Sequence, residues 1–203
     1  MMKSITSNQL SDFAEIYLDD IELISIDMPN SDDIEYLSRQ FIKSRQDLKL
    51  QWVLELEDKK SIDYALPKSI ESSLRSMLIN QISASSEMLA ELLGCNKVGV
   101  RLATLRSPMC PRFHVDKIPC RLLITLCGGG TEWIANKDVN WKIFADTNDT
   151  TPVKDNAEIQ RFKTGHWSLL KGGAWNNNFN GVVHRSPHEI DKRLLLSLDP
   201  IFD

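Results

Sequence analysis

The spacing of hydrophobic residues along the chain changes near residue 94. Residues 32–46 repeat apolar side chains at helical intervals behind an acidic start, which predicts an amphipathic helix. Residues 48–56 alternate apolar and polar side chains, which predicts a strand. A second helical pattern covers residues 67–93, beginning at a proline and followed by Gly94. The first part of the chain is therefore expected to be rich in helix.

After Gly94 the pattern becomes that of a β-sheet protein, with short apolar runs between stretches rich in glycine, proline and asparagine. We predict strands at residues 98–105, 112–116, 119–126, 131–134, 158–163, 167–170, 181–184 and 193–198. Many short strands in about a hundred residues favour a β-sandwich, a jelly roll or a small barrel. The polar stretch 136–157 is expected to be a long connection or lid.

These patterns predict an α+β protein in which residues 1–95 form an α-rich N-terminal extension that packs on a β-barrel formed by residues 96–203. No linker rich in proline, glycine or serine separates the two parts, so the first is not expected to be an independent domain. The length of 203 residues suits one domain, and 42% hydrophobic residues with 26% charged residues argue against disorder.

The two parts differ in charge. Residues 1–95 hold 17 acidic and 9 basic residues, whereas residues 96–203 hold 11 acidic and 15 basic residues. The second part is thus mildly basic, which suits an anionic small molecule but does not indicate nucleic acid. The apolar run 122–127 is too short to span a membrane, and the first residues lack the apolar stretch of a secretory signal. We therefore expect a cytoplasmic protein.

The cysteines Cys95, Cys110, Cys120 and Cys127 show no CxxC spacing. In a cytoplasmic protein they are expected to be free thiols. A zinc site that uses Cys110, His114 and Cys120 is an alternative, although structural zinc sites usually contain closely spaced ligand pairs.

His114 and Asp116 stand two positions apart in a predicted strand, and His184 follows 68 residues after Asp116. The period of a strand puts His114 and Asp116 on one face, roughly 6.5 Å apart. If the strand that contains His184 lies beside them, two imidazoles and one carboxylate form the ligand set of a non-haem Fe(II) site with open positions. Zn(II) accepts the same donors, and each histidine taken alone also fits a structural role.

Arg193 begins the last predicted strand, where alternation puts Arg193, Leu195 and Ser197 on one face. If this face points into the barrel, the guanidinium enters a largely apolar cavity and needs an anion, for which a carboxylate is the natural partner. The alternative is an arginine at the surface that pairs with Glu189 or Asp191.

The order of His114, Asp116, His184 and Arg193 resembles that of the double-stranded β-helix oxygenases, which use Fe(II) and 2-oxoglutarate. The resemblance implies a jelly-roll, cupin-like fold for residues 96–203. It also implies that the two histidines and the aspartate hold the iron, and that Arg193 binds the distal carboxylate of 2-oxoglutarate. Many better-known oxygenases carry an R-x-S triplet on the last core strand, whereas this chain has Leu195 two positions after Arg193.

Arg121 and Thr125 share one face of the predicted strand 119–126 and are further candidates to contact 2-oxoglutarate. Their assignment rests on the same resemblance, because nothing in their spacing identifies a ligand.

A closer resemblance covers roughly residues 97–200. The segments 128–133, 184–187 and 193–200 are similar to an uncharacterised bacterial family known as domain of unknown function 1826, whose members are sometimes encoded near zinc-handling GTPases. Three functions therefore stay open. The chain could be an Fe(II)/2-oxoglutarate-dependent oxygenase with an unknown prime substrate. It could be a non-redox, zinc-binding cupin-like protein linked to metal homeostasis, or a binding β-sandwich with ordinary histidines.

Overall fold

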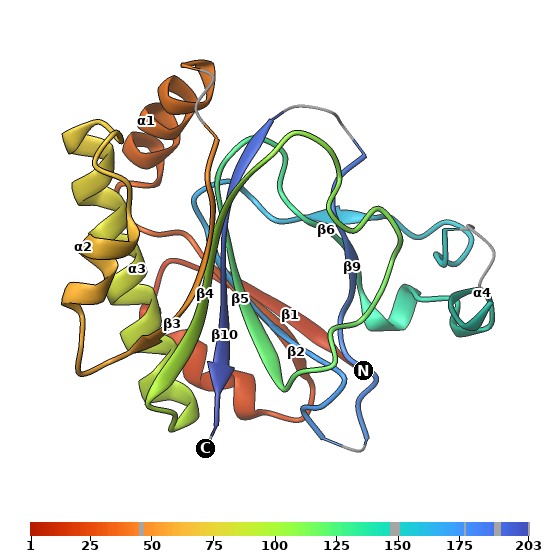
Figure 1. Ribbon diagram of the computed structural model, residues 1–203. Helices are drawn as coiled ribbons and strands as arrows, with labels where there is room; N and C mark the ends of the chain where they lie inside the picture. The colour runs from red at the N-terminus through yellow and green to blue at the C-terminus, as the bar shows by residue number, and fades with distance from the viewer. Residues whose placement is uncertain (45–46, 147–150, 177, 189–191, 203) are drawn as a thin grey trace.

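The computed structural model describes residues 1–203 except 45–46, 147–150, 177, 189–191 and 203. Within these residues the chain forms two β-sheets (Figure 1). The larger sheet has the strand order β1 (Lys3–Ser7), β2 (Ile21–Ile26), β8 (Trp167–Lys171), β5 (Cys120–Cys127), β10 (Arg193–Ile201), β4 (Lys97–Leu105) and β3 (Lys49–Glu55). The smaller sheet has the order β7 (Gln160–Arg161), β6 (Glu132–Ile134) and β9 (Val183–Arg185).

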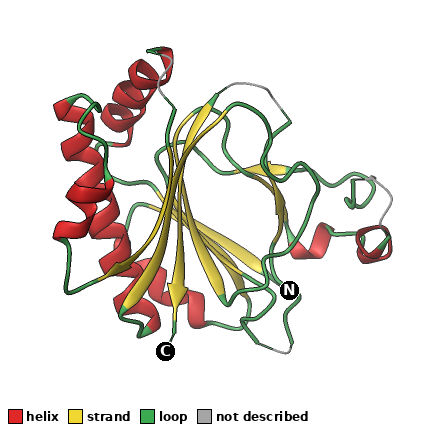
Figure 2. Ribbon diagram, viewed as in Figure 1, coloured by secondary structure: helices red, strands yellow, loops and turns green. Residues whose placement is uncertain are grey.

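The helices α1 (Ser31–Lys43), α2 (Lys60–Ala65) and α3 (Ser72–Leu93) lie on one side of the larger sheet, while the smaller sheet lies on its other side (Figure 2). The 3-10 helix η1 (Leu10–Tyr17) connects β1 to β2. Apolar faces of α1 and α3 pack against the sheet, with Ile34, Leu78 and Ile82 fully buried. This apolar layer forms the main hydrophobic core of the molecule.

Alternation along the central strands sorts their side chains between this core and a pocket on the opposite face of the sheet. On β10, Leu194, Leu196 and Leu198 belong to the main core. Arg193, Leu195 and Ser197 line the pocket instead. The face assigned to Arg193 from the sequence is therefore confirmed.

The predicted mixed α+β class is confirmed, but the first 95 residues contribute more than helices. They also supply β1, β2 and β3, of which β2 pairs with β8 and β3 pairs with β4. The description of this part as an α-rich extension therefore omits β1 and β2, whereas β3 lies within the strand predicted over residues 48–56. The division into residues 1–95 and 96–203 stays a prediction. The larger sheet contains strands from both sides of that boundary.

Among the strands predicted after Gly94, the segment 112–116 is the exception. It is not a strand in this structure, and only an isolated bridge joins His114 to His184. The stretch 136–157, expected as a long connection, contains η2 (Asn136–Asp138) and α4 (Trp141–Ala145). In the described part of the chain, no helix has the length and apolar character needed to cross a membrane.

The predicted helix over residues 67–93 begins later than its proline suggested. α3 starts at Ser72, where the carboxylate of Glu71 accepts hydrogen bonds from the backbone N–H groups of Ser73 and Leu74. This side-chain cap satisfies N–H groups that have no partner inside the helix. The other end matches the prediction, since Gly94 closes α3 in the left-handed conformation with a φ of 68°.

Candidate metal centre

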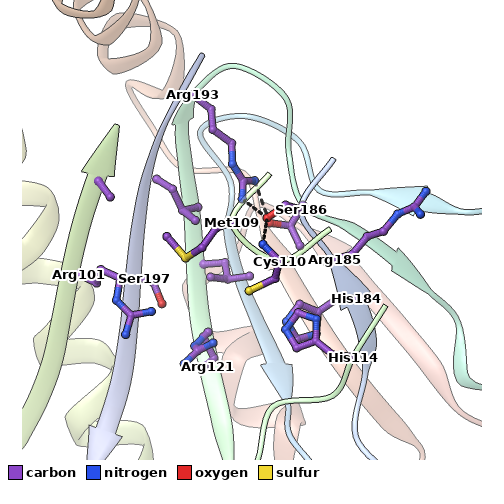
Figure 3. A pocket seen from close by; sticks show the side chains of 14 residues that line it. Arg101, Met109, Cys110, His114, Arg121, His184, Arg185, Ser186, Arg193 and Ser197 are labelled. Atoms are coloured by element: carbon purple, nitrogen blue, oxygen red, sulfur yellow. Dashed lines mark hydrogen bonds between the residues drawn. The ribbon is translucent and has the colours of Figure 1, made fainter. Parts of the chain in front are cut away.

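His114, Asp116 and His184 converge on one point, with their candidate ligand atoms all within 4.8 Å of one another. The Nε2 atom of His114 lies 3.8 Å from Asp116 Oδ1, and the Nε2 atom of His184 lies 3.4 Å from Asp116 Oδ2. The two imidazole rings face the pocket side by side, with ring centroids 4.4 Å apart (Figure 3). The structure thus brings together the three residues that the sequence selected.

The backbone around His114 reaches this position without being a strand. His114 and His184 exchange two backbone hydrogen bonds of 2.9 Å, which fixes the first histidine beside β9. After His114 the chain turns away, and the N–H of Gly173 donates to the carbonyl of Asp116 at 2.8 Å. The predicted strand face, with a separation of roughly 6.5 Å, is therefore wrong for this pair. A turn, rather than strand alternation, points Asp116 at the histidines.

Three glycines allow this turn to lie against its neighbours. A Cβ added to Gly172 would lie 2.0 Å from the carbonyl oxygen of Ile118. A Cβ added to Gly181, which has a φ of 86°, would lie 2.3 Å from Val115 Cγ1. On Gly173 the same addition would lie 3.3 Å from that atom. Only residues without a side chain fit at the first two positions.

Hydrogen bonds on the far side of each ring decide which nitrogen faces Asp116. The Nδ1 atom of His114 lies 3.0 Å from the carbonyl oxygen of Arg112, and that of His184 lies 3.0 Å from the carbonyl oxygen of Val182. A carbonyl can only accept, so each Nδ1 carries the proton and donates it. In the neutral ring, Nε2 is then an acceptor. Backbone carbonyls orient metal-binding histidines in the same manner.

The protonation tendencies of His114 and Asp116 suit a cation. Burial, followed by the charge of His184, lowers the pKa of His114 and favours its neutral form. Burial raises the pKa of Asp116, but the hydrogen bond and charge of His184 together with the charge of Arg121 outweigh it, so the pKa lies below its usual value. Two imidazole lone pairs and a carboxylate therefore face one point, where a proton or a cation is needed between them. This donor set fits a divalent metal ion.

Arg121 contacts Asp116 rather than an open part of the pocket. Its Nη1 atom donates to both carboxylate oxygens of Asp116 at 2.9 Å. Its Nε and Nη2 atoms donate to Asp199 at 2.6 and 2.8 Å. The guanidinium is thus shared between two carboxylates. Its expected contact with 2-oxoglutarate stays a prediction, and the geometry favours a role in positioning Asp116.

Arg193 is buried, with 5% of its surface exposed, at the end of the pocket away from the two histidines (Figure 3). Its Nη1 atom donates to Thr131 Oγ1 at 3.2 Å and to the carbonyl of Gly129 at 3.4 Å. Its Nη2 atom donates to Ser186 Oγ at 3.2 Å. Within the described residues no carboxylate contacts it, and burial lowers its pKa to about 10. The alternative prediction, an arginine at the protein surface, is wrong because Arg193 is buried. The partners expected in that alternative, Glu189 and Asp191, lie outside the described residues.

The glycine run 128–130 lies in close contact with Arg193 and Phe162. A Cβ added to Gly128 would lie 2.6 Å from Arg193 Cβ, and one added to Gly130 would lie 1.8 Å from the carbonyl oxygen of Phe162. Gly128 has a φ of 91°, and the register between β5 and β10 shifts beside it. The run therefore forms an irregular turn that carries the backbone close to Arg193.

Ser186 and Arg101 line the same pocket, and neither was identified from the sequence as a ligand-binding residue. Ser186 exchanges hydrogen bonds with the backbone of Cys110 and also accepts the bond from Arg193. In the sequence, the feature that could have identified Ser186 as a pocket residue was its position two residues after His184. Thr125, by contrast, is buried and does not line this pocket. Its contact with 2-oxoglutarate stays a prediction.

The four cysteines are free thiols in this structure, as expected. Cys110 is exposed, whereas Cys120 is fully buried in the larger sheet. The group of potential ligands found among the described residues contains neither of them. The alternative zinc site with Cys110, His114 and Cys120 therefore receives no support.

Solved structures with the same fold include proteins bound to 2-oxoglutarate. Dioxygenase for auxin oxidation 1 from Arabidopsis thaliana, in a binary complex with 2-oxoglutarate, is 10% identical with a TM-score of 0.58, covering 100% of this chain and 93% of that chain. A Pseudomonas putida prolyl-4-hydroxylase is 8% identical with a TM-score of 0.52, covering 96% and 100%. A full-length Neurospora crassa protein in complex with α-ketoglutarate is 12% identical with a TM-score of 0.50, covering 98% and 84%. At these identities the likeness establishes the fold.

A family model described as "Protein of unknown function (DUF1826)" matches residues 7–199. The match extends over both parts of the chain, including the first 95 residues, for which the sequence had offered no resemblance. No curated protein matches the chain.

Proposed function

The chain belongs to the DUF1826 family, and we propose that it is an Fe(II)- and 2-oxoglutarate-dependent oxygenase that acts on a prime substrate still to be identified. The observation that carries the proposal is the combination of two features in one pocket. Two imidazoles and a carboxylate face one point. At the other end lies a buried guanidinium with no carboxylate partner among the described residues.

The order of the strands supports a double-stranded β-helix as the framework of the site. From β5 onward the strands alternate between the larger sheet and the smaller one, except that β6 and β7 both lie in the smaller sheet. The bridge at His114 adds the remaining position beside β9. The similar solved structures include a dioxygenase bound to 2-oxoglutarate, which agrees with this interpretation.

In the proposed site, His114 Nε2, His184 Nε2 and the carboxylate of Asp116 would hold Fe(II). When bound, the metal supplies the redox centre at which O₂ reacts while 2-oxoglutarate is converted to succinate and CO₂. Arg193 would bind the distal carboxylate of 2-oxoglutarate through charge-assisted hydrogen bonds. Thr131 and Ser186 hold the guanidinium in place beforehand, so little side-chain entropy is lost on binding.

The apolar part of the pocket supports the same assignment. Ala103, Leu123 and Leu195 line the same pocket as the two candidate histidine ligands and the arginine. They limit the access of water, so a charge on Arg193 is screened less than at the surface. A non-redox zinc protein would use the same three donors. That function would not explain why Arg193 is buried without a carboxylate among the described residues.

The test is an anaerobic titration of the metal-free protein with Fe(II) and then with 2-oxoglutarate, followed by the visible charge-transfer absorption of the ternary complex. We expect one Fe(II) to bind, the band to appear on addition of 2-oxoglutarate, and succinate to form once O₂ is admitted. His184→Ala should lose metal binding. Arg193→Gln should keep the metal and bind 2-oxoglutarate about 10–100-fold more weakly.

Arg106→Gln provides a matched control, since Arg106 is an exposed arginine that pairs with Asp47 just beyond β4. It should behave as the unmodified protein. Binding of Zn(II) with no binding of 2-oxoglutarate in any metal form would contradict the oxygenase and favour the zinc-binding alternative. Normal 2-oxoglutarate binding by Arg193→Gln would contradict the role given to this arginine.

A further inference from the structure

Arg101 is a second arginine in the pocket for which the described residues provide no carboxylate. It lies on β4 directly opposite Ser197 of β10, and both residues line the pocket. Figure 3 shows its guanidinium beside Ser197, on the opposite side of the pocket from the two imidazoles. The helix-facing neighbours Val100 and Leu102 are buried in the main core, so the strand's alternation directs Arg101 to the pocket side.

Only some of the arginines that line the pocket are paired with a carboxylate among the described residues. Arg121 is bonded to Asp116 and Asp199, and Arg185 donates to Glu132 at 2.7 Å. In the described part of the chain neither Arg101 nor Arg193 contacts a carboxylate, and Arg101 forms no hydrogen bond or ion pair with a side chain. Asp116 lies behind the two histidines and is bonded to Arg121, and the described residues that line the pocket itself include no acidic residue. Two guanidinium groups therefore face the same space without a counter-charge from this part of the chain.

One 2-oxoglutarate molecule cannot satisfy both arginines. Under the proposed function, the 2-oxo acid end of 2-oxoglutarate would lie at the metal held by His114, Asp116 and His184, which leaves a single distal carboxylate for Arg193. Arg101, across the pocket from the two imidazoles, would still lack an anion, and a partly enclosed charge is stabilised by binding one. The prime substrate is the remaining molecule that enters the pocket.

We propose that Arg101 binds an oxyanion on the prime substrate, so that the substrate is a small acid with an apolar portion next to its anionic group. Its apolar portion would contact Ala103, Met109 and Leu123, which line the same pocket. The planar guanidinium can bind two oxygens of one carboxylate or phosphate at once, which fixes the direction of the substrate as well as its charge. The inference uses the proposed function to assign Arg193, but the anion site itself can be tested without metal.

The test uses metal-free protein and two probes of the same shape, butyrate and its neutral analogue butyramide, with binding followed by NMR chemical shifts. The background is Arg193→Gln, which leaves Arg101 as the uncompensated arginine of the pocket. We expect this variant to bind butyrate and not butyramide. Adding Arg101→Gln should weaken butyrate binding about tenfold or more, and Arg101→Lys should restore part of it. Arg106→Gln in the same background should have no effect.

Inorganic phosphate, titrated in the same way, distinguishes the two kinds of oxyanion. Tighter Arg101-dependent binding of phosphate would indicate a phosphorylated substrate, and tighter binding of butyrate a carboxylic acid. Equal butyrate binding with and without Arg101 would overturn the inference. It would also be overturned if, in the Fe(II) titration, Arg101→Gln lost 2-oxoglutarate and Arg193→Gln retained it, because Arg101 would then be the co-substrate arginine.

The two proposals fail in different ways. If the unmodified protein binds no Fe(II) or 2-oxoglutarate but still binds butyrate through Arg101, the oxygenase is refuted and the anion site stands. If the ternary complex forms normally but Arg101 has no effect on any anion, only the substrate class is refuted. Thermal unfolding of each variant shows whether it remains folded.

Discussion

Asp116 is the residue on which the geometry of the candidate centre depends most. Its carboxylate lies between two imidazoles on one side and the guanidinium of Arg121 on the other. The backbone carbonyl of Asp116 is held separately by Gly173. The side chain and the main chain are thus fixed by different neighbours, which is typical of ligands that must keep one orientation.

At this scale we predict that Arg121→Gln weakens Fe(II) binding by about 10–100-fold, because the carboxylate of Asp116 loses the group that orients it. Arg121→Lys should give an intermediate effect, since a lysine keeps the charge but not the planar fork. Competition titration with a chelator under anaerobic conditions measures the affinity, with Arg106→Gln as the control. An unchanged affinity in a folded Arg121→Gln protein would show that the imidazoles and the backbone position Asp116 by themselves.

At the scale of elements, the segment 113–118 has no regular structure, yet it fits its surroundings closely. It packs against Gly172, Gly173 and Gly181, and its first part is joined to β9 by the bridge at His114. The ring of Phe113 lies under the guanidinium of Arg185, 4.2 Å from the ring centroid. The segment is therefore held in position by contacts with β9 and with the residues after β8, and not by the continuous hydrogen bonds of a β-strand.

We predict that Gly181→Ala displaces the segment and abolishes most metal binding. The new Cβ would meet Val115 Cγ1 at 2.3 Å and Gly173 N at 2.7 Å. Strain and overpacking together should lower the free energy of unfolding by about 2–4 kcal/mol. Urea unfolding and metal titration on the same sample measure the two effects.

Gly94→Ala is the matched control for backbone strain. Gly94 also has a positive φ, 68°, but an added Cβ would meet nothing within 4 Å. This variant should lose about 1 kcal/mol of stability and bind metal normally. Equal metal binding by Gly181→Ala and Gly94→Ala would show that the close contact at Val115 does not position the site.

At the scale of the whole molecule, the larger sheet joins residues from both parts of the chain and carries helices on one face and the candidate site on the other. The sheet face under the helices is formed by buried aliphatic residues of β4, β5 and β10: Val98, Val100, Leu102, Leu122, Ile124, Leu126, Leu194, Leu196 and Leu198. The helices that cover it, α1 and α3, lie before residue 96. The same framework that holds Arg193 and Arg121 therefore depends on the first part of the chain.

We predict that residues 96–203 expressed alone do not fold. Without the first part, the apolar face of the sheet is exposed and β4 and β8 lose their partners β3 and β2. Circular dichroism, NMR dispersion and Fe(II) titration of the fragment, compared with the full chain, test this. A soluble, folded fragment that binds metal would contradict the prediction and support the division at residue 95.

Much of the second part of the chain was predictable because its strands are apolar runs separated by glycine, proline and asparagine. β4, β5, β8 and β10 lie within a few residues of the positions that these runs predicted. By contrast, β1 is a polar edge strand and β2 is buried throughout, so neither shows alternation. Their places in the sheet depend on pairing with each other and, for β2, with β8, across more than 140 residues of chain.

By itself, the sequence identified candidate residues for the chemistry, because the chain holds only four histidines and two of them stand in predicted strands, one of them two positions from a carboxylate. Only the tertiary structure decided how they are used. Asp116 faces the histidines through a turn, Arg121 is neutralised by two carboxylates, and Arg101 and Arg193 are left without one among the described residues. The physical reason is that a side chain's direction is set by local backbone geometry, whereas the compensation of its charge depends on residues brought together from distant segments.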